Sequence, residues 1–134
     1  MAPVPGTTPE AQQATICVVE GDAQEREALS QLMSHLKHQV SAFESAEALL
    51  GALDQVDIGV LVVNLDLPGQ NGLELLKALA ERGRMAPTIM LASESDVATA
   101  VGAIRAGAMD FIQKPVIDRI LLRRVQDALE QPRS

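Results

Sequence analysis

The sequence predicts an α/β fold in which a doubly wound, five-stranded parallel sheet is covered by helices on both faces. Short apolar runs alternate with segments whose apolar residues recur every three or four positions, and the connections between them are short. Right-handed crossovers place the helices of such a chain on both faces of the sheet. With 134 residues, 47% of them hydrophobic, the chain can fill one core, and we see no internal repeat.

Five apolar runs predict the strands. In chain order they are "TICVV" at 15–19, "VSAF" at 40–43, "IGVLVV" at 58–63, "PTIMLA" at 87–92 and "MDFI" at 109–112. The first, third and fourth runs are continuously apolar, which is typical of strands buried on both faces, so we expect them at the centre. "VSAF" is shorter and more polar, which suits an edge strand. The strand order 2-1-3-4-5 follows by analogy with known doubly wound folds.

Five amphipathic helices alternate with these strands, each marked by apolar residues three or four positions apart. Ser45 and Asp96 are placed to cap the second and fourth helices, and Gly83 and Gly107 to end the third and fourth. The apolar residues of the helices are Leu29, Leu32, Met33 and Leu36; Leu49, Leu50 and Leu53; Leu73, Leu76 and Leu79; Val97, Val101 and Ile104; and Ile117, Ile120, Leu121, Val125 and Leu129.

The predicted domain covers residues 15–130. Residues 1–14 have no basic start, apolar block or periodicity, so we expect a flexible arm rather than a signal peptide. Residues 131–134, "QPRS", are interpreted as a tail or the start of a linker. The longest apolar run, 58–63, is far too short to span a bilayer, so we expect no membrane partner.

Charge and cysteine content narrow the function classes. The net charge of −7 argues against direct nucleic-acid binding, because duplex phosphates would repel the chain. The pair Arg123 and Arg124 is therefore read as a solvated or interface face of the last helix. The single Cys17 lies in an apolar strand and is interpreted as a buried small hydrophobe; one cysteine forms no internal disulfide, which favours a cytoplasmic location.

Polar residues gather where the predicted strands end. In open parallel sheets, ligands bind outside the carboxyl ends of the strands, so these residues are the candidate site. They are Glu20, Gly21 and Asp22 after the first strand, Asn64 and Asp66 after the third, Ala92 and Ser93 after the fourth, and Lys114 after the fifth.

Four segments together resemble a known family. "ICVVEGD", "LVVNLDLPGQNG", "PTIMLASESD" and "AIRAGAMDFIQKP" look like the receiver domain of bacterial two-component response regulators, closest to FixJ-type and NtrC-type receivers, over roughly residues 14–130. The most specific block is "AGAMDFIQKP", which combines an Ala-Gly-Ala turn, an aromatic three residues before the lysine and a Lys-Pro ending. The resemblance implies the (βα)5 flavodoxin-like receiver fold.

The resemblance also implies a chemistry that this sequence meets only in part. Receivers accept a phosphoryl group from a histidine kinase onto an Asp at the end of strand 3, with Mg²⁺ held by acids after strand 1. Asn64 stands at the acceptor position, and its amide oxygen is not a competent nucleophile. Gly21 stands at the second acid, a direct metal ligand in the family, and Ala92 replaces the switch hydroxyl. Lys114 and the switch aromatic, Phe111, are retained, and we expect an inward Phe111 ring.

We interpret the chain as an atypical pseudo-receiver without a phosphoacceptor Asp, not an enzyme, with no cofactor and weak or absent Mg²⁺ binding. Asn64 alone could be a natural or an engineered replacement of the acceptor Asp. Gly21 and Ala92 indicate that more of the phosphorylation site is lost than the acceptor. We hypothesise that Lys114 contacts Glu20 or Asn64 and fixes one conformation. A distance beyond about 6 Å from both would reject this.

Our leading hypothesis is a phosphorylation-independent interaction module that controls an output such as transcription, through an output domain or a partner protein. The family dimerises through its fourth helix, fifth strand and fifth helix, so we expect a homodimer there. The interface residues would be Val97, Ile104, Arg105, Asp110, Arg119 and Arg123.

Two alternatives stay open. One is Mg²⁺-dependent phosphorylation at Asp66 or Ser93, although Ser93 follows the strand and should point to its opposite face. The other is a sensor that binds a small ligand in the altered site. His35 and His38 are read as a solvated helix end rather than as a metal or relay site, since no third ligand accompanies them.

Overall fold

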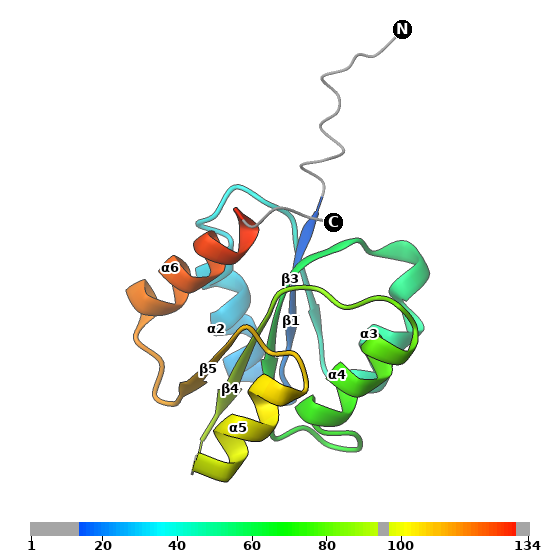
Figure 1. Cartoon of the computed structure of the whole chain (residues 1–134). Helices are drawn as coiled ribbons and strands as arrows, with labels where there is room; N and C mark the ends of the chain where they lie inside the picture. Colours follow the sequence, from blue (N-terminus) through cyan, green and yellow to red (C-terminus); the bar gives the residue numbers. More distant parts are fainter. Residues whose placement is uncertain (1–13, 94–96, 131–134) are drawn as a thin grey trace, which may run out of the picture.

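A five-stranded parallel sheet forms the centre of the computed structural model, which describes residues 14–93 and 97–130 (Figure 1). The strand order is β2-β1-β3-β4-β5, and every neighbouring pair is parallel. The predicted fold class and strand order are confirmed. The more polar second strand lies at an edge, and the continuously apolar first, third and fourth strands are interior.

The elements follow the predicted runs closely. The strands are β1 (Thr15–Val19), β2 (Val40–Phe43), β3 (Ile58–Asn64), β4 (Thr88–Ala92) and β5 (Asp110–Gln113). The helices are α2 (Ala23–Met33), α3 (Ala46–Gly51), α4 (Gly72–Glu81), α5 (Val97–Arg105) and α6 (Asp118–Leu129), with a 3₁₀ helix, η2 (Leu53–Gln55), after α3.

Three predicted helices are shorter than their apolar patterns. α6 begins at Asp118, so that Ile117 is its N-cap residue. α2 ends at Met33, and Leu36 lies in the following turn, where its N–H donates to the Met33 carbonyl at 2.9 Å. α3 ends at Gly51, and Leu53 belongs to η2. Both leucines still pack against core residues. The apolar spacing therefore predicts which residues are buried, even where the α-helix has already ended.

The core has two layers, one on each face of the sheet, because successive side chains of a strand point to opposite faces. Figure 1 shows α2 and α6 on one face and α3 and α4 on the other. Ile16 and Val18 of β1 pack with residues of α2 and α6, whereas Cys17 and Val19 pack with residues of α3 and α4. Cys17 is fully buried, as predicted, and burial with the nearby charge of Asp57 raises the pKa of its thiol to about 12.

Capping residues mark several boundaries. The Ser45 side chain accepts from the Ala48 N–H at 3.0 Å, as predicted, and Asn71 forms a capping box with Glu74 at the start of α4. Gly83 and Gly107 follow α4 and α5 with φ of 67° and 111°, which explains glycine there. The predicted cap Asp96, the arm and the tail 131–134 lie outside the described residues, Ala14 excepted. Within the described residues, no helix is long and apolar enough to cross a membrane.

Candidate functional site

The candidate residues meet at the carboxyl edge of the sheet, as predicted. Val19 is in register with Val63, so the residues that follow, Glu20 and Asn64, stand side by side. Lys114 follows β5, and its backbone N–H donates to the Ala92 carbonyl at 2.8 Å. The sheet register therefore gathers residues from the ends of four strands into one cluster.

Asn64 and Glu20 form the buried centre of this cluster, with 6% and 2% of their surfaces exposed. Asn64 Nδ2 donates to Glu20 Oε1 at 3.0 Å and to Oε2 at 3.1 Å. Asn64 Oδ1 accepts from the Asp66 N–H at 3.2 Å. The amide thus donates to a carboxylate and accepts from a backbone N–H, and a carboxylate at position 64 would lack the donor.

Lys114 carries the positive charge of the cluster. Its Nζ lies 3.3 Å from Glu20 Oε1 and 2.5 Å from Glu25 Oε1, and its side chain is 17% exposed. The predicted contact with Glu20 is present. Burial lowers the pKa of Lys114, but the hydrogen bond to Glu25 and the charge of Glu20 outweigh burial, so that its pKa is raised above the usual 10.5. The ammonium is therefore held in its charged form.

Asp22 serves the helix and the cluster together. Its Oδ2 accepts from the Glu25 N–H at 2.8 Å, which caps α2, and its own N–H donates to Glu20 Oε2 at 3.1 Å. Glu20 Oε2 thus accepts from Asp22 and Asn64, while Oε1 accepts from Asn64 and Lys114. Both oxygens of the Glu20 carboxylate are engaged.

Gly21 lies under the loop between β3 and α4. A Cβ at position 21 would come 2.8 Å from Pro68 Cδ, closer than carbon atoms approach without displacement. Pro68 Cδ is bonded to the backbone nitrogen, so the loop itself would have to move. The loop and the glycine are therefore fitted to each other.

Comparison with known proteins identifies the family. Residues 16–126 match the model of the response regulator receiver domain. The chain belongs to this family. The response regulator protein TmoT of Ectopseudomonas mendocina is 36% identical over 119 residues, 89% of this chain and 54% of TmoT. The transcriptional regulatory protein FixJ of Bradyrhizobium diazoefficiens is 34% identical over 116 residues, 87% of this chain and 57% of FixJ.

Solved receiver structures have the same fold. The structure of FixJ-N superposes with a TM-score of 0.82 at 33% identity, covering 92% of this chain and 98% of that one. The crystal structure of a response regulator receiver protein from Pseudoalteromonas atlantica superposes with a TM-score of 0.79 at 38% identity, covering 86% of this chain and 96% of that one. This receiver domain spans about half the length of TmoT and FixJ.

The other predicted site residues of the receiver domain lie around this cluster. Ala92 is fully buried at the end of β4, and Ser93, the next residue, is exposed. Asp66 is exposed, and only its backbone N–H joins the network described here. Phe111 is partly buried and packs against the core layer of α3 and α4. The inward position of its ring stays a prediction.

The predicted interface residues lie on α5, β5 and α6. Val97 and Ile104 are 80% and 50% exposed, and Val101 between them is 41% exposed. Asp110 forms an ion pair with Arg124 of the same chain. The remaining predicted interface residues, Arg105, Arg119 and Arg123, are exposed. We use "α5 stripe" below for Val97, Val101 and Ile104.

The sequence reasoning missed Glu25 and Arg26. Glu25 reaches Lys114 from the first turn of α2, and Arg26 Nη1 donates to the Glu20 carbonyl at 2.9 Å. Their places after the Asp22 cap were a usable signal, because the first turn of a helix that starts at the carboxyl edge must face the site. The exposed His35 lies in the turn after α2 and its Nδ1 is 3.1 Å from the Leu32 carbonyl oxygen, which fits the predicted solvated position. The same prediction is wrong for His38, which is partly buried and whose Nδ1 is buried without a hydrogen-bond partner among the described residues.

Proposed function

We propose that this receiver domain signals without accepting a phosphoryl group. The observation that carries the proposal is the pair of hydrogen bonds from Asn64 Nδ2 to the buried Glu20 carboxylate. Phosphoryl transfer needs a nucleophilic carboxylate, and the Asn64 amide has no charge and points its donor at Glu20. The side chain at the acceptor position therefore stabilises the fold instead of reacting.

We further propose that Mg²⁺ binds weakly or not at all, and that no other cofactor is needed. Mg²⁺ requires several oxygen ligands in octahedral geometry. The Glu20 oxygens already accept hydrogen bonds, Asp22 caps α2, and Gly21 offers no side chain. Among the described residues, no group of three or more His, Cys, Asp or Glu side chains is arranged to hold a metal ion. The donor set does not fit the family's metal.

The α5 stripe supports a role as an interaction module rather than an enzyme. Three aliphatic side chains spaced three and four residues apart lie on one side of a helix and are 41% to 80% exposed, which favours a protein contact. We propose a homodimer through α5, β5 and α6, with Arg105, Arg119 and Arg123 at its polar rim. FixJ is named a transcriptional regulatory protein, and the match covers only 57% of its length, which supports an output such as transcription.

Intact-mass measurement after incubation with acetyl phosphate and Mg²⁺ tests the proposal. We expect no phosphoryl adduct, while the receiver domain of FixJ, treated in parallel, serves as the reference for a standard receiver. A stoichiometric adduct would overturn the proposal. Asp66→Asn and Ser93→Ala variants would then assign the adduct to one of the two alternative acceptors.

A further inference from the structure

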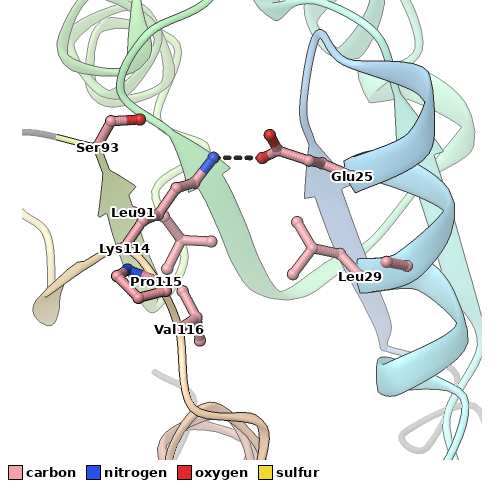
Figure 2. Close-up of a pocket in the computed structure, with 8 residues that line it drawn as sticks. Glu25, Leu29, Leu91, Ser93, Lys114, Pro115 and Val116 are labelled. Atoms are coloured by element: carbon pink, nitrogen blue, oxygen red, sulfur yellow. Dashed lines mark hydrogen bonds and ion pairs between the residues drawn. The ribbon is translucent and has the colours of Figure 1, made fainter.

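A pocket of about 480 Å³ opens beside the Lys114 ion pairs (Figure 2). Leu29 and Glu25 reach it from α2, and Lys114 and Val116 come from the segment after β5. The complete lining is Glu25, Ala28, Leu29, Leu91, Ser93, Lys114, Pro115 and Val116. Its volume is that of a small-molecule site.

We propose that this pocket binds a small organic cation that has an apolar body and one ammonium group. The site goes beyond the proposed function, because neither Asn64 nor the α5 stripe takes part in it. The ammonium would lie at Glu25, and the apolar body would lie against Leu29 and Val116.

The apolar body is supported by the division of the pocket into two ends. In Figure 2 the side chains of Ser93, Lys114 and Glu25 lie together at one end, and those of Leu29 and Val116 lie toward the other. Leu91 is fully buried beneath the apolar end, and Leu29 and Val116 are partly buried. A ligand that covers Leu29 and Val116 removes their exposed apolar surface from water, at about 25 cal/mol per Å².

The positive charge is supported by the balance of charges around the pocket. Glu25 and Lys114 are the charged residues of the lining, and Lys114 is also paired with the buried Glu20, so that one ammonium is shared by two carboxylates. An added ammonium neutralises the excess carboxylate, whereas an added carboxylate doubles it. Electrostatics therefore select a cation, even though a lysine lines the site.

Glu25 is suited to hold a second cation. Its Oε1 contacts Lys114, and within the described part of the chain no hydrogen bond reaches its Oε2. The side chain is 53% exposed, so it can turn toward a ligand without breaking the buried Glu20 pair. The Ser93 hydroxyl oxygen, at the same end of the pocket, is a second acceptor for an N–H.

Three probes with one phenylethyl body and different charge test the proposal on the full chain: 2-phenylethylammonium, 2-phenylethanol and 3-phenylpropionate. We expect saturable binding of the ammonium, with Kd of about 1 mM or below by calorimetry, and binding at least about tenfold weaker for the alcohol and the carboxylate. Equal or tighter binding of the carboxylate, or no saturation by the ammonium below about 10 mM, would overturn the proposal.

Two variants locate the binding. Glu25→Gln should weaken ammonium binding by about tenfold or more, whereas Glu27→Gln, an exposed carboxylate on the same helix, should leave it unchanged. Equal effects would show that general surface charge attracts the probe and would overturn the site. Backbone amide chemical shifts of the unaltered protein supply a second readout, which must change at Leu29 and Val116 when the probe is added.

Discussion

The strand-end cluster and the α5 stripe are opposite in character. In the cluster, Glu20 and Asn64 are almost fully buried, and each oxygen and nitrogen of their side-chain termini is hydrogen-bonded. The stripe leaves Val97, Val101 and Ile104 exposed on a helix. The polar groups of the cluster thus have their hydrogen-bond partners. The apolar side chains of the stripe are exposed to solvent. This difference is the basis of our proposal that the cluster preserves one conformation and that the stripe forms the protein contact.

Removing the centre of the cluster should have the largest effect. Glu20→Ala leaves the Asn64 amide and Lys114 without their shared acceptor, and we expect a loss of about 3 kcal/mol in the free energy of unfolding. Urea denaturation measures this. Glu25→Ala is the matched control. The ion pair of Glu25 with Lys114 is exposed to solvent, so its loss should cost less than about 1 kcal/mol. Equal losses of unfolding free energy in the two variants would mean that the buried hydrogen bonds of Glu20 stabilise the fold no more than the exposed ion pair of Glu25 does.

Placing an acid at position 21 should be the next most costly change. Gly21→Asp forces a Cβ toward Pro68 Cδ, and we expect a loss of about 2 kcal/mol from this overpacking. Thermal or urea unfolding gives the value. Pro68→Ala removes the contacting ring carbons, so the double variant should recover most of the loss. If the double variant is no more stable than Gly21→Asp, the contact with Pro68 is not the cause.

Placing a carboxylate at position 64 should destabilise the cluster in a pH-dependent way. Asn64→Asp places two carboxylates next to each other where the amide now donates to Glu20, which raises the pKa of the new acid. Below the usual pKa of an Asp the variant should match the parent, and the penalty should grow as pH rises, to about 1–2 kcal/mol at pH 7. Unfolding free energies at several pH values measure it. A variant as stable as the parent at pH 7 would contradict the account.

Altering the stripe should have the smallest effect on folding. Ile104→Glu replaces a half-exposed side chain, so the free energy of unfolding should change by less than about 0.5 kcal/mol. Self-association should nevertheless weaken, because a carboxylate would enter the proposed dimer contact. Sedimentation velocity compares the self-association of Ile104→Glu with that of Gln55→Glu, which adds the same charge at an exposed site on η2. Equal self-association of both variants would show that the stripe is not part of the dimer interface.

The sequence predicted the sheet and the cluster for one shared reason. Buried parallel strands read as continuous apolar runs, and their carboxyl ends must meet at one edge, so the contact between Lys114 and Glu20 was predictable. The contact of Glu25 with Lys114 depends on how the first turn of α2 packs over that edge. The fit of Pro68 over Gly21 depends on the path of a loop. The place of Glu25 after the Asp22 cap indicated the first turn of α2, but which of its side chains reaches Lys114, like the path of the Pro68 loop, depends on the packed structure.

The proposed pocket shows the same limit. Its lining comes from α2, from the end of β4 and from the segment after β5, which are far apart in the chain. Each lining residue has an ordinary sequence context, and only the packed structure shows Leu29 and Val116 on the same cavity. Its charge balance likewise depends on which carboxylates α2 brings to the edge.

Sedimentation equilibrium with and without Mg²⁺ and fluoroberyllate, a mimic of the phosphoryl group, tests the central claim most directly. A receiver whose cluster is closed and whose stripe is permanently exposed should associate with the same dimer Kd, within about twofold, under both conditions. Association that tightens by about tenfold or more when the mimic is added would show that the site still takes a phosphoryl group and controls the contact.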